Sequence, residues 1–177
     1  HPNMPWDGSR LYVAEVSYDT AVLPTVGEVR CVAGGDDISV FQPEFTEDCR
    51  SLIYVSDETG MQQLWCHALE SGDNRQITSR PVEHGQPAWM QDMRSYGLLP
   101  GGALAAVACN DRGFVRLHQV DLGSGEARSV DAAAHFTELA QLSINPCLPV
   151  VAFVGSCSTL CPRVVTIDLA SNHEDVV

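Results

Sequence analysis

Three cysteines lie close enough in the sequence to suggest a metal site. Cys157 and Cys161 are four residues apart, and Cys147 precedes Cys157 by ten residues. A structural zinc site takes four thiolate or imidazole ligands, normally as two close pairs. The nearest further candidate is His173, which has no second ligand beside it. We therefore expect these cysteines to lie in loops, and the sequence predicts no metal ligands and no cofactor.

Hydrolytic chemistry would require a nucleophile beside a base. His118, Asp121 and Ser124 are the residue types of a serine-hydrolase triad. They fall within one strand and the turn after it, where nothing orients the base toward the nucleophile. The Gly-x-Ser-x-Gly sequence of a nucleophile elbow is absent from the 177 residues. No catalytic residue is predicted.

Composition restricts the partners. The formal net charge is -13, from 10 basic and 23 acidic residues, so binding to nucleic acid or to an anionic membrane surface is not expected. No apolar run approaches the roughly 20 residues of a membrane helix. The seven cysteines are odd in number and scattered, and no secretory signal is recognised at the start. These features predict reduced thiols and a cytoplasmic location.

Short phrases recur in the same order along the chain and reveal the elements that would position these residues. The first phrase is Gln42-Pro43-Glu44-Phe45, echoed at 86–89 and at 1–4. The second is a turn followed by an alternating strand, which begins at Asp7, at Asp48 and, in weaker form, at Gly101 and Pro146. Counted from the second turn residue, the steps are 41, 53 and 45 residues.

A third phrase steps with the second. It is clearest at Ser71-Gly72 and Ser124-Gly125, with copies at Gly27-Glu28 and, degraded, at Ser171-Asn172. The steps are 45, 53 and 47 residues. Two independent markers with a period near 45 indicate four repeats, at about residues 1–35, 36–85, 86–138 and 139–177.

Each repeat consists of short strands separated by turn residues. Segments 52–56, 63–69, 115–122 and 164–169 are rich in β-branched and aromatic residues or alternate apolar with polar ones. Ser-Gly and Asp-Gly pairs supply the left-handed positions of tight hairpins. Only 131–142 has a helical composition, and its alanines suit a connection equally well. The sequence predicts an all-β domain over 1–177, a β-propeller of about four WD40-like four-stranded blades.

The phrases resemble the WD40-like repeats in the propeller of the prolyl oligopeptidase family, above all in bacterial acylaminoacyl peptidases and dipeptidyl aminopeptidases. The likeness is carried by residues 1–8, 41–45, 54–57, 117–121 and 153–165. In that family the propeller typically has seven blades, is followed by an α/β-hydrolase domain and admits only short peptides to the catalytic serine. The resemblance implies the C-terminal part of such a propeller, without the hydrolase domain.

Some positions depart from the family pattern. Cys49 replaces the Gly of an Asp-Gly turn, Asn145-Pro146-Cys147 replaces another such turn, and Cys66 stands where a polar residue is expected. A residue other than Gly at a left-handed turn position costs about 1 kcal/mol. We interpret these departures as a sequence released from the constraint of an intact enzyme.

A few residues are candidates for binding. His84 lies in the longest insertion, two residues before Gln86, and Gln42 opens the matching phrase of the preceding repeat. We predict that His84, Gln86 and Gln42 are contacts at the upper rim; a connector with a solvated His is the alternative.

Two further groups have structural explanations. Propeller lactonases hold a metal ion in the central channel with carboxylates from several blades. The acidic loop residues show no such convergence in the sequence and are expected to be solvated, and the tryptophans recur in phase with the repeats and are expected to pack between strands. The acidic residues are Asp57, Glu58, Asp92 and Asp111, and the tryptophans are Trp6, Trp65 and Trp89.

A half-length propeller would expose apolar sheet faces and open strand edges at its ends. Two copies related by a two-fold axis would cover them in a ring of eight blades. The sequence therefore predicts a non-catalytic propeller module, related to the substrate-selecting domain of a serine peptidase and self-associating as a homodimer. The alternatives are part of a split or truncated acylaminoacyl peptidase-like enzyme with a hydrolase-domain partner, or a metal-dependent propeller lactonase or hydrolase.

Overall fold

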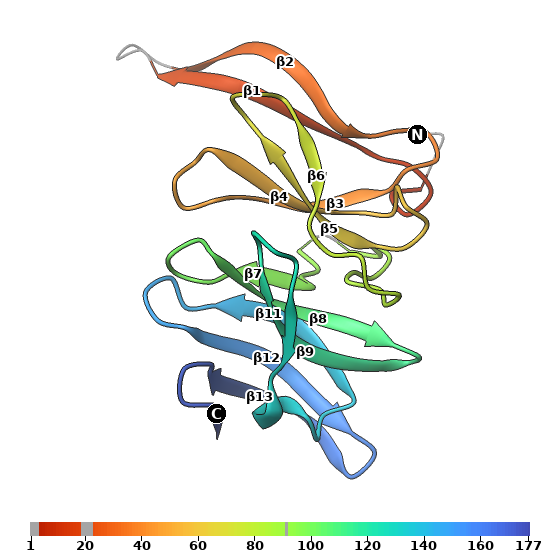
Figure 1. Ribbon diagram of the computed structural model, residues 1–177, viewed down its shortest axis with the longest axis vertical. Coiled ribbons are helices and arrows are strands. Elements are labelled where there is room, and N and C mark those ends of the chain that lie inside the picture. The colour runs from red at the N-terminus through yellow and green to blue at the C-terminus, as the bar shows by residue number, and fades with distance from the viewer. Residues whose placement is uncertain (1–3, 19–22, 91) are drawn as a thin grey trace.

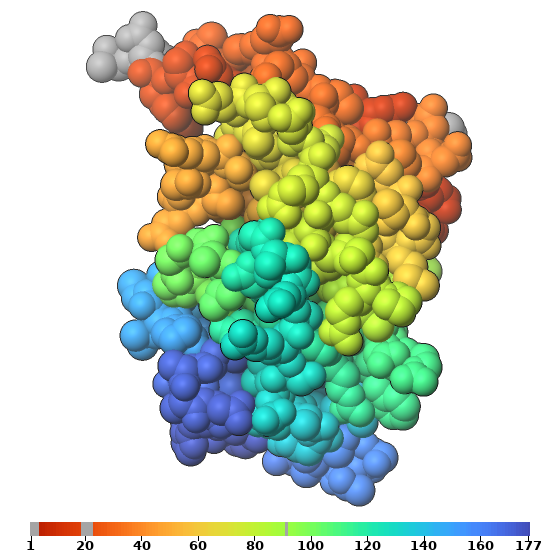
Figure 2. Space-filling view, viewed as in Figure 1, coloured from red at the N-terminus to blue at the C-terminus, as the bar shows by residue number. Residues whose placement is uncertain are grey.

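Antiparallel sheets follow one another along the long axis of the molecule in chain order (Figures 1 and 2). The structure is a computed structural model that describes residues 4–18, 23–90 and 92–177. The first sheet is a hairpin of β1 (Arg10–Tyr18) and β2 (Pro24–Gly34), and the other three sheets have four strands each. The second sheet contains β3 (Val40–Phe45), β4 (Ser51–Ser56), β5 (Gln63–Ala68) and β6 (Asn74–Gln76).

The last two sheets repeat this pattern. The third contains β7 (Tyr96–Leu98), β8 (Leu104–Asp111), β9 (Phe114–Asp121) and β10 (Ala127–Ser129). The fourth contains β11 (Glu138–Ile144), β12 (Val150–Cys157), β13 (Leu160–Asp168) and β14 (His173–Val176). In each of these sheets the strands pair antiparallel in chain order, as in a propeller blade. The predicted all-β propeller architecture is confirmed.

The first repeat differs from the other three. Its described part forms two long strands instead of four short ones. β2 runs to Gly34 and β3 begins at Val40, so the five residues between them leave no room for an outer strand. Gly27, which was matched to the hairpin turns of later repeats, lies inside β2 opposite β1. The left-handed glycine of this repeat is Gly34, at φ 88°.

Turn hydrogen bonds align the first strands of the other blades. The N–H of Thr46 donates to Ser51 O, that of Leu99 to Leu104 O and that of Asn145 to Val150 O. The residues four positions before these N–H donors are Gln42, Ser95 and Gln141, which are therefore equivalent in the three blades. The phrase at 86–89, matched to Gln42 by sequence, precedes β7 and lies outside any strand. The longer third repeat therefore carries its extra residues in segment 86–94.

Residues 131–142, which have a helical composition, form a connection and a strand and not a long helix. Residues 131–133 form one 3-10 turn, η1 (Asp131–Ala133), and β11 begins at Glu138. The alanines thus form the connection between the third and fourth blades. Among the described residues, no helix is long and apolar enough to cross a bilayer.

The core lies between the blades, not inside any one of them. Val107 and Cys109 on β8 face the second sheet and pack in one cluster with Ile53 and Val55. The alternate residues of β8 face the fourth sheet, where Phe136 and Phe153 meet edge to face at 5.5 Å between ring centroids. The two-residue period of a strand thereby gives one blade two buried faces.

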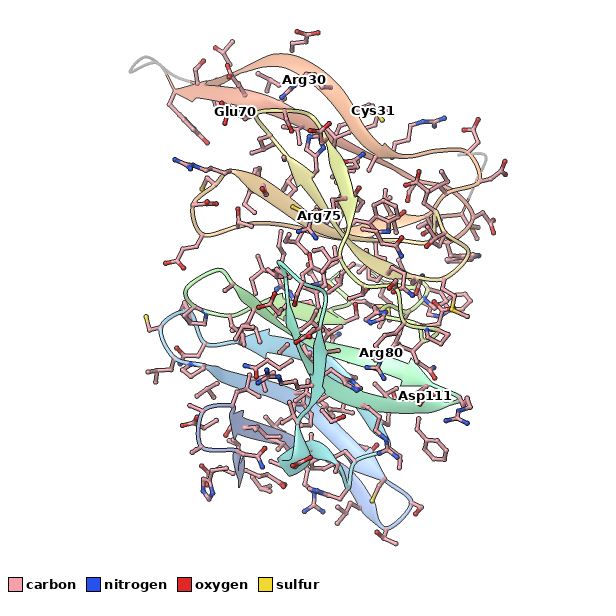
Figure 3. The ribbon with its side chains drawn as sticks, in the orientation of Figure 1. Arg30, Cys31, Glu70, Arg75, Arg80 and Asp111 are labelled. Carbon is pink, nitrogen blue, oxygen red and sulfur yellow. The ribbon has the colours of Figure 1, made fainter. Side chains whose placement is uncertain are left out.

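Polar contacts fix the blades in register. The Arg75 guanidinium reaches from β6 to the third sheet, where Nη2 donates to Leu122 O at 2.8 Å (Figure 3). The N–H of Gly101 donates to Glu47 Oε2 at 2.9 Å. Asn172 Oδ1 accepts the N–H of Ala132 at 3.1 Å, which ties the fourth blade to the connection before it.

The two outermost sheets leave apolar side chains exposed. On the hairpin, Tyr12 is 53% exposed and Val29 is 58% exposed. On the fourth sheet, Val164 lies opposite Val154 and is 47% exposed, whereas the alternate residues Val165 and Phe153 are buried against the third blade. Both ends of the array therefore present apolar surface that no described residue covers.

Gly125 and Gly72 occupy the same hairpin turn in successive blades and offer a matched pair. Both have left-handed φ, at 76° and 79°, but a Cβ on Gly125 would lie 2.1 Å from Ile77 O, whereas Gly72 has open space around it. We expect Gly72→Ala to lower the free energy of unfolding by about 1 kcal/mol and Gly125→Ala by about 3 kcal/mol. Urea unfolding checks this. Equal effects of the two substitutions would contradict the close approach of neighbouring blades.

Candidate functional site

The first strands of the blades, β3, β7 and β11, meet where the centre of a propeller would lie. Each forms the same edge of its sheet. Hydrogen bonds connect them, from the Gln42 side chain to Tyr96 O at 2.7 Å and from the N–H of Leu142 to Arg94 O at 3.4 Å. Described residues of the third repeat's insertion, within 86–90 and 92–94, line a cleft at this meeting point.

The cleft has a narrow part and a wide part. The narrow part has a volume of about 130 Å³ and is largely apolar; its lining includes Phe41, Gln86, Met90, Met93, Ser95 and Gln141. The wide part, of about 550 Å³, shares Phe41 and both methionines with it. Its lining adds Gln42, Glu44 and Trp89.

Backbone bulges shape the walls. Gln42 and Gln141 are at φ 49° and 57°, at equivalent places in β3 and β11. At each place the pairing with the next strand shifts, between Phe41 and Glu44 in β3 and between Ala140 and Ser143 in β11. A bulge bends its strand and redirects its side chains, and it recurs at functional sites in sheets.

Gln42 has a structural role within the cleft wall. Its Oε1 accepts the N–H of Ser95 at 2.8 Å, while Nε2 donates to Tyr96 O at 2.7 Å and to Glu44 Oε1 at 3.0 Å. The buried Tyr96 hydroxyl lies 2.7 Å from both Gln42 O and Ile53 O. Gln42 thus joins two blades with both ends of its amide, which leaves little of it for a partner.

The charged residues of the cleft lining are Glu44, Asp92 and Arg94. Arg94 Nη1 lies 3.0 Å from Glu44 Oε1, and the Glu44 side chain is only 19% exposed. Trp89 stacks against Trp6 with ring centroids 4.5 Å apart and is 65% exposed, so it borders the cleft instead of packing inside a blade as its position in the repeat predicted. The lining therefore combines apolar side chains and amides with one arginine and two carboxylates.

The rim residues predicted from sequence occupy different places. Gln86 lines the narrow part of the cleft, and Gln42 the wide part. His84 is completely buried, so its side chain has no surface to offer a partner and is not solvated either. The neighbouring Gly85 shows how closely this segment packs against the second sheet, because a Cβ at Gly85 would lie 2.7 Å from the Phe41 ring.

Burial governs the chemistry of His84. Neither ring nitrogen makes a hydrogen bond. Burial lowers the pKa of His84 to about 4, although the backbone carbonyls of Gln62 and Val82 act in the opposite direction. Burial likewise lowers the pKa of His118, with help from the positive charge of Arg80. Both rings are therefore neutral at pH 7.

The triad considered from sequence has other partners. Asp121 Oδ1 accepts the N–H of Ser124 at 2.7 Å and its hydroxyl at 3.0 Å, which closes a turn and lowers the pKa of the carboxyl. The His118 ring lies 3.4 Å from the Ser129 hydroxyl instead.

The metal candidates are also separate. Within 4–18, 23–90 and 92–177, no three His, Cys, Asp or Glu side chains are grouped to hold a metal ion. Asp57 accepts the N–H of Ser39 at 2.7 Å, and Asp111 pairs with Arg112 at 3.0 Å. The Cys157 thiol lies 3.4 Å from the Thr159 hydroxyl, a contact that lowers the pKa of the thiol.

Three cleft residues, Met90, Met93 and Ser95, were not among the candidates from sequence. None belongs to a recognisable motif. The signal that points to them is the step of 53 residues where the other steps are 41 to 47, because the added residues form one wall of the cleft.

Gln42 and Gln141 share backbone geometry but not hydrogen bonds, which makes Gln141 a matched control. Gln42→Ala leaves the Ser95 N–H and the Tyr96 carbonyl without their partner. We expect Gln42→Ala to lower the free energy of unfolding by about 2 kcal/mol, and Gln141→Ala, at an exposed position, by well under half as much. Chemical denaturation measures both, and equal losses would contradict the joining role.

His84 makes stability depend on pH. With a pKa of about 4 in the folded chain and 6.5 as the ordinary value, the unfolded chain binds more protons between these values, so stability falls as pH falls through this window. His84→Leu should remove about 2 kcal/mol of the loss between pH 7 and pH 5. The exposed His173→Gln serves as control. The same pH dependence in both variants would show that His84 is not buried as described.

The sequence matches no protein-family model and no curated protein. Among solved structures, a puromycin-hydrolyzing peptidase of Mycobacterium tuberculosis is 25% identical with a TM-score of 0.86. A puromycin hydrolase is 29% identical with a TM-score of 0.87. Each match covers 99% of this chain but only 25% of the other chain.

A more distant structure shows how widely the fold occurs. The oligogalacturonate lyase of Vibrio parahaemolyticus is 15% identical with a TM-score of 0.61, which supports the fold alone. The puromycin hydrolases, in contrast, combine high structural agreement with 25% to 29% identity along nearly the whole chain. As the recurring phrases predicted, the chain resembles part of the propeller of a prolyl oligopeptidase family enzyme.

Proposed function

We propose that the chain is a non-catalytic propeller module that selects short peptide-like molecules for a serine peptidase. The observation that supports this most directly is the cleft where β3, β7 and β11 meet. Its lining combines Phe41, Met90 and Met93 with the amides of Gln86 and Gln141. Side-chain amides both donate and accept hydrogen bonds, as peptide groups require.

The structural relatives support the same role. They are named for puromycin hydrolysis, and this chain corresponds to one quarter of each of them. The rest of such an enzyme would supply the reacting groups, so we assign this quarter to admission and selection of the substrate.

We further propose that the chain acts as a homodimer. The exposed Tyr12 and Val29 on the hairpin and Val164 on the fourth sheet are apolar surfaces at opposite ends of the array. Two copies related by a two-fold axis could pair the first end of one with the last end of the other, twice, and close a ring. Covering these surfaces would contribute about 25 cal/mol for each Å² of apolar area removed from water.

A hydrolase-domain partner is the other candidate for these surfaces, and it fits the structural relatives equally well. The metal-dependent lactonase has less support, because no described residues gather into a cation site.

Light scattering on the purified chain tests self-association. We expect twice the mass of one chain, and we expect Val164→Glu to give the single mass because it places a charge on the proposed contact. Ala170→Glu, at an exposed turn, is the control and should remain dimeric. A well-folded monomer would overturn the homodimer.

The same preparation tests the non-catalytic role. We expect no hydrolysis of an aminoacyl p-nitroanilide by the chain alone. Release of nitroaniline above the uncatalysed rate would overturn this proposal.

A further inference from the structure

The strand β2 of the first sheet takes the place of the outermost strand of a blade. After β10, the outermost strand of the third blade, the N–H of Ala132 donates to Asn172 Oδ1 in the last hairpin turn of the next blade, at 3.1 Å. The end of β2 makes the same kind of contact, because Asn74 Nδ2, at the end of the last hairpin turn of the second blade, donates to Val32 O at 2.8 Å. The first sheet therefore ends as the complete blades do.

The strand β1 then takes the place of a third strand. The N–H of Ser9, directly before β1, donates to Ile38 O ahead of β3 at 3.0 Å, just as the N–H of Val115 in β9 donates to Thr137 O ahead of β11 at 2.9 Å. The third strand β9 pairs with β10 along one edge and with β8 along the other. Among the described residues β1 pairs only with β2, so its second edge carries backbone N–H and C=O groups that no strand uses.

Phe45 faces the place where the inner strands of such a blade would lie. The turn hydrogen bonds make Phe45, Leu98 and Ile144 equivalent, as the residues directly before each N–H donor. Ile144 packs on the first strand of the preceding blade, because a Cβ on Gly97 would collide with its side chain. Leu98 and Ile144 are partly buried against the cores between blades, whereas Phe45 is 55% exposed. The second blade therefore exposes an aromatic side chain at a position that later blades cover.

A groove of about 460 Å³ separates the hairpin from the second sheet at this place. The third strand β9 has four buried residues, whereas β1 has none. The side of β1 that borders the groove is thus open along its length. The lining is apolar at Val13, Ala14, Phe45 and Leu69 and charged at Glu15, Glu28 and Arg30.

The complete blades define the kind of polypeptide that fits. The strands beside their third strands are β4, β8 and β12, and the first two of these are almost entirely buried. An added pair of strands must accordingly be apolar on both faces of its second strand. A second copy has no such pair to give, because each inner pair in the described residues already belongs to a complete blade.

We propose that the free edge of β1 and the exposed Phe45 form a docking site for a β-hairpin of a partner polypeptide. The hairpin completes the first blade by strand addition: its second strand pairs with β1, and its first strand covers Phe45. This inference goes beyond the proposed function, because it uses a strand edge and not the cleft or the sheet faces of the proposed homodimer.

Hydrogen exchange on the full chain tests the proposal, with synthetic peptides of the three inner pairs as probes. The peptides span residues 40–56, 96–111 and 138–157. In the chain alone, the amides of β1 should exchange faster than those of β13, the third strand of the last blade, which is paired on both edges. At least one peptide should slow exchange in β1 tenfold or more and leave β13 unchanged.

Variants locate the contact. Phe45→Ser should weaken binding of that peptide about tenfold, since an aromatic surface is no longer covered. Phe114→Ser is the matched control, because Phe114 is 51% exposed in the third sheet, away from the groove, and should leave binding unchanged. Unfolding curves establish that both variants are folded.

A proline in the second strand of the peptide provides a further control. Tyr54→Pro, Val107→Pro or Phe153→Pro, made in whichever peptide binds, should abolish protection of β1, because proline cannot sit in a central strand.

Three results would overturn the proposal. They are protection of β1 equal to that of β13 in the chain alone, no protection by any of the three peptides, and equal peptide affinity in Phe45→Ser and the unchanged chain. Protection of β1 that rises with chain concentration and needs no peptide would assign the edge to a second copy instead. Light scattering reports the homodimer and exchange in β1 reports strand addition, so either idea can fail while the other stands.

Discussion

Packing of one sheet face against the next is the constraint on which the rest of the structure depends. A single four-stranded blade has two apolar faces and cannot bury either of them alone. β8 shows this directly, since Val107 and Cys109 belong to one core and Ala106 and Ala108 to the other. Stability is therefore shared between neighbours, and each connection must bring its blade close to the one before. Long polar side chains such as Arg75 and Gln42 therefore cross the junctions between blades.

The cleft is a consequence of the same packing. Because blades meet most closely through their central strands, the first strands β3, β7 and β11 converge at one edge, where backbone amides need partners. Gln42 supplies them across one junction, with its amide bound to residues 95 and 96. Once that amide is committed to the fold, the amides of the cleft lining that remain are those of Gln86 and Gln141.

Much of the fold could be predicted from the sequence because turns and alternating strands are local features. The Ser-Gly pairs at Gly72 and Gly125 do mark hairpins. Cys49, expected at a left-handed turn, is at φ 54°. The match of the phrase at 86–89 to Gln42 was wrong because a short Gln-Pro motif does not specify which strand a segment pairs with. The turn hydrogen bonds decide that pairing. The burial of His84 could not be predicted, since it depends on contacts between residues far apart in the chain: the neighbouring Gly85 packs on Phe41, and the N–H of Glu83 donates to Asn110 O of the third sheet.

The insertion at 86–94 connects these observations. The turns on either side of it remain in phase with the repeat, so the added residues leave the blades intact and project only where the first strands meet. A blade that packs through both faces tolerates extra length at its edges alone. The added segment places Met90 and Met93 in the same cleft lining as Phe41. A repeat of the common length would lack both methionines. In the function that we propose, selectivity would therefore lie in the longest repeat, whose added residues line the cleft.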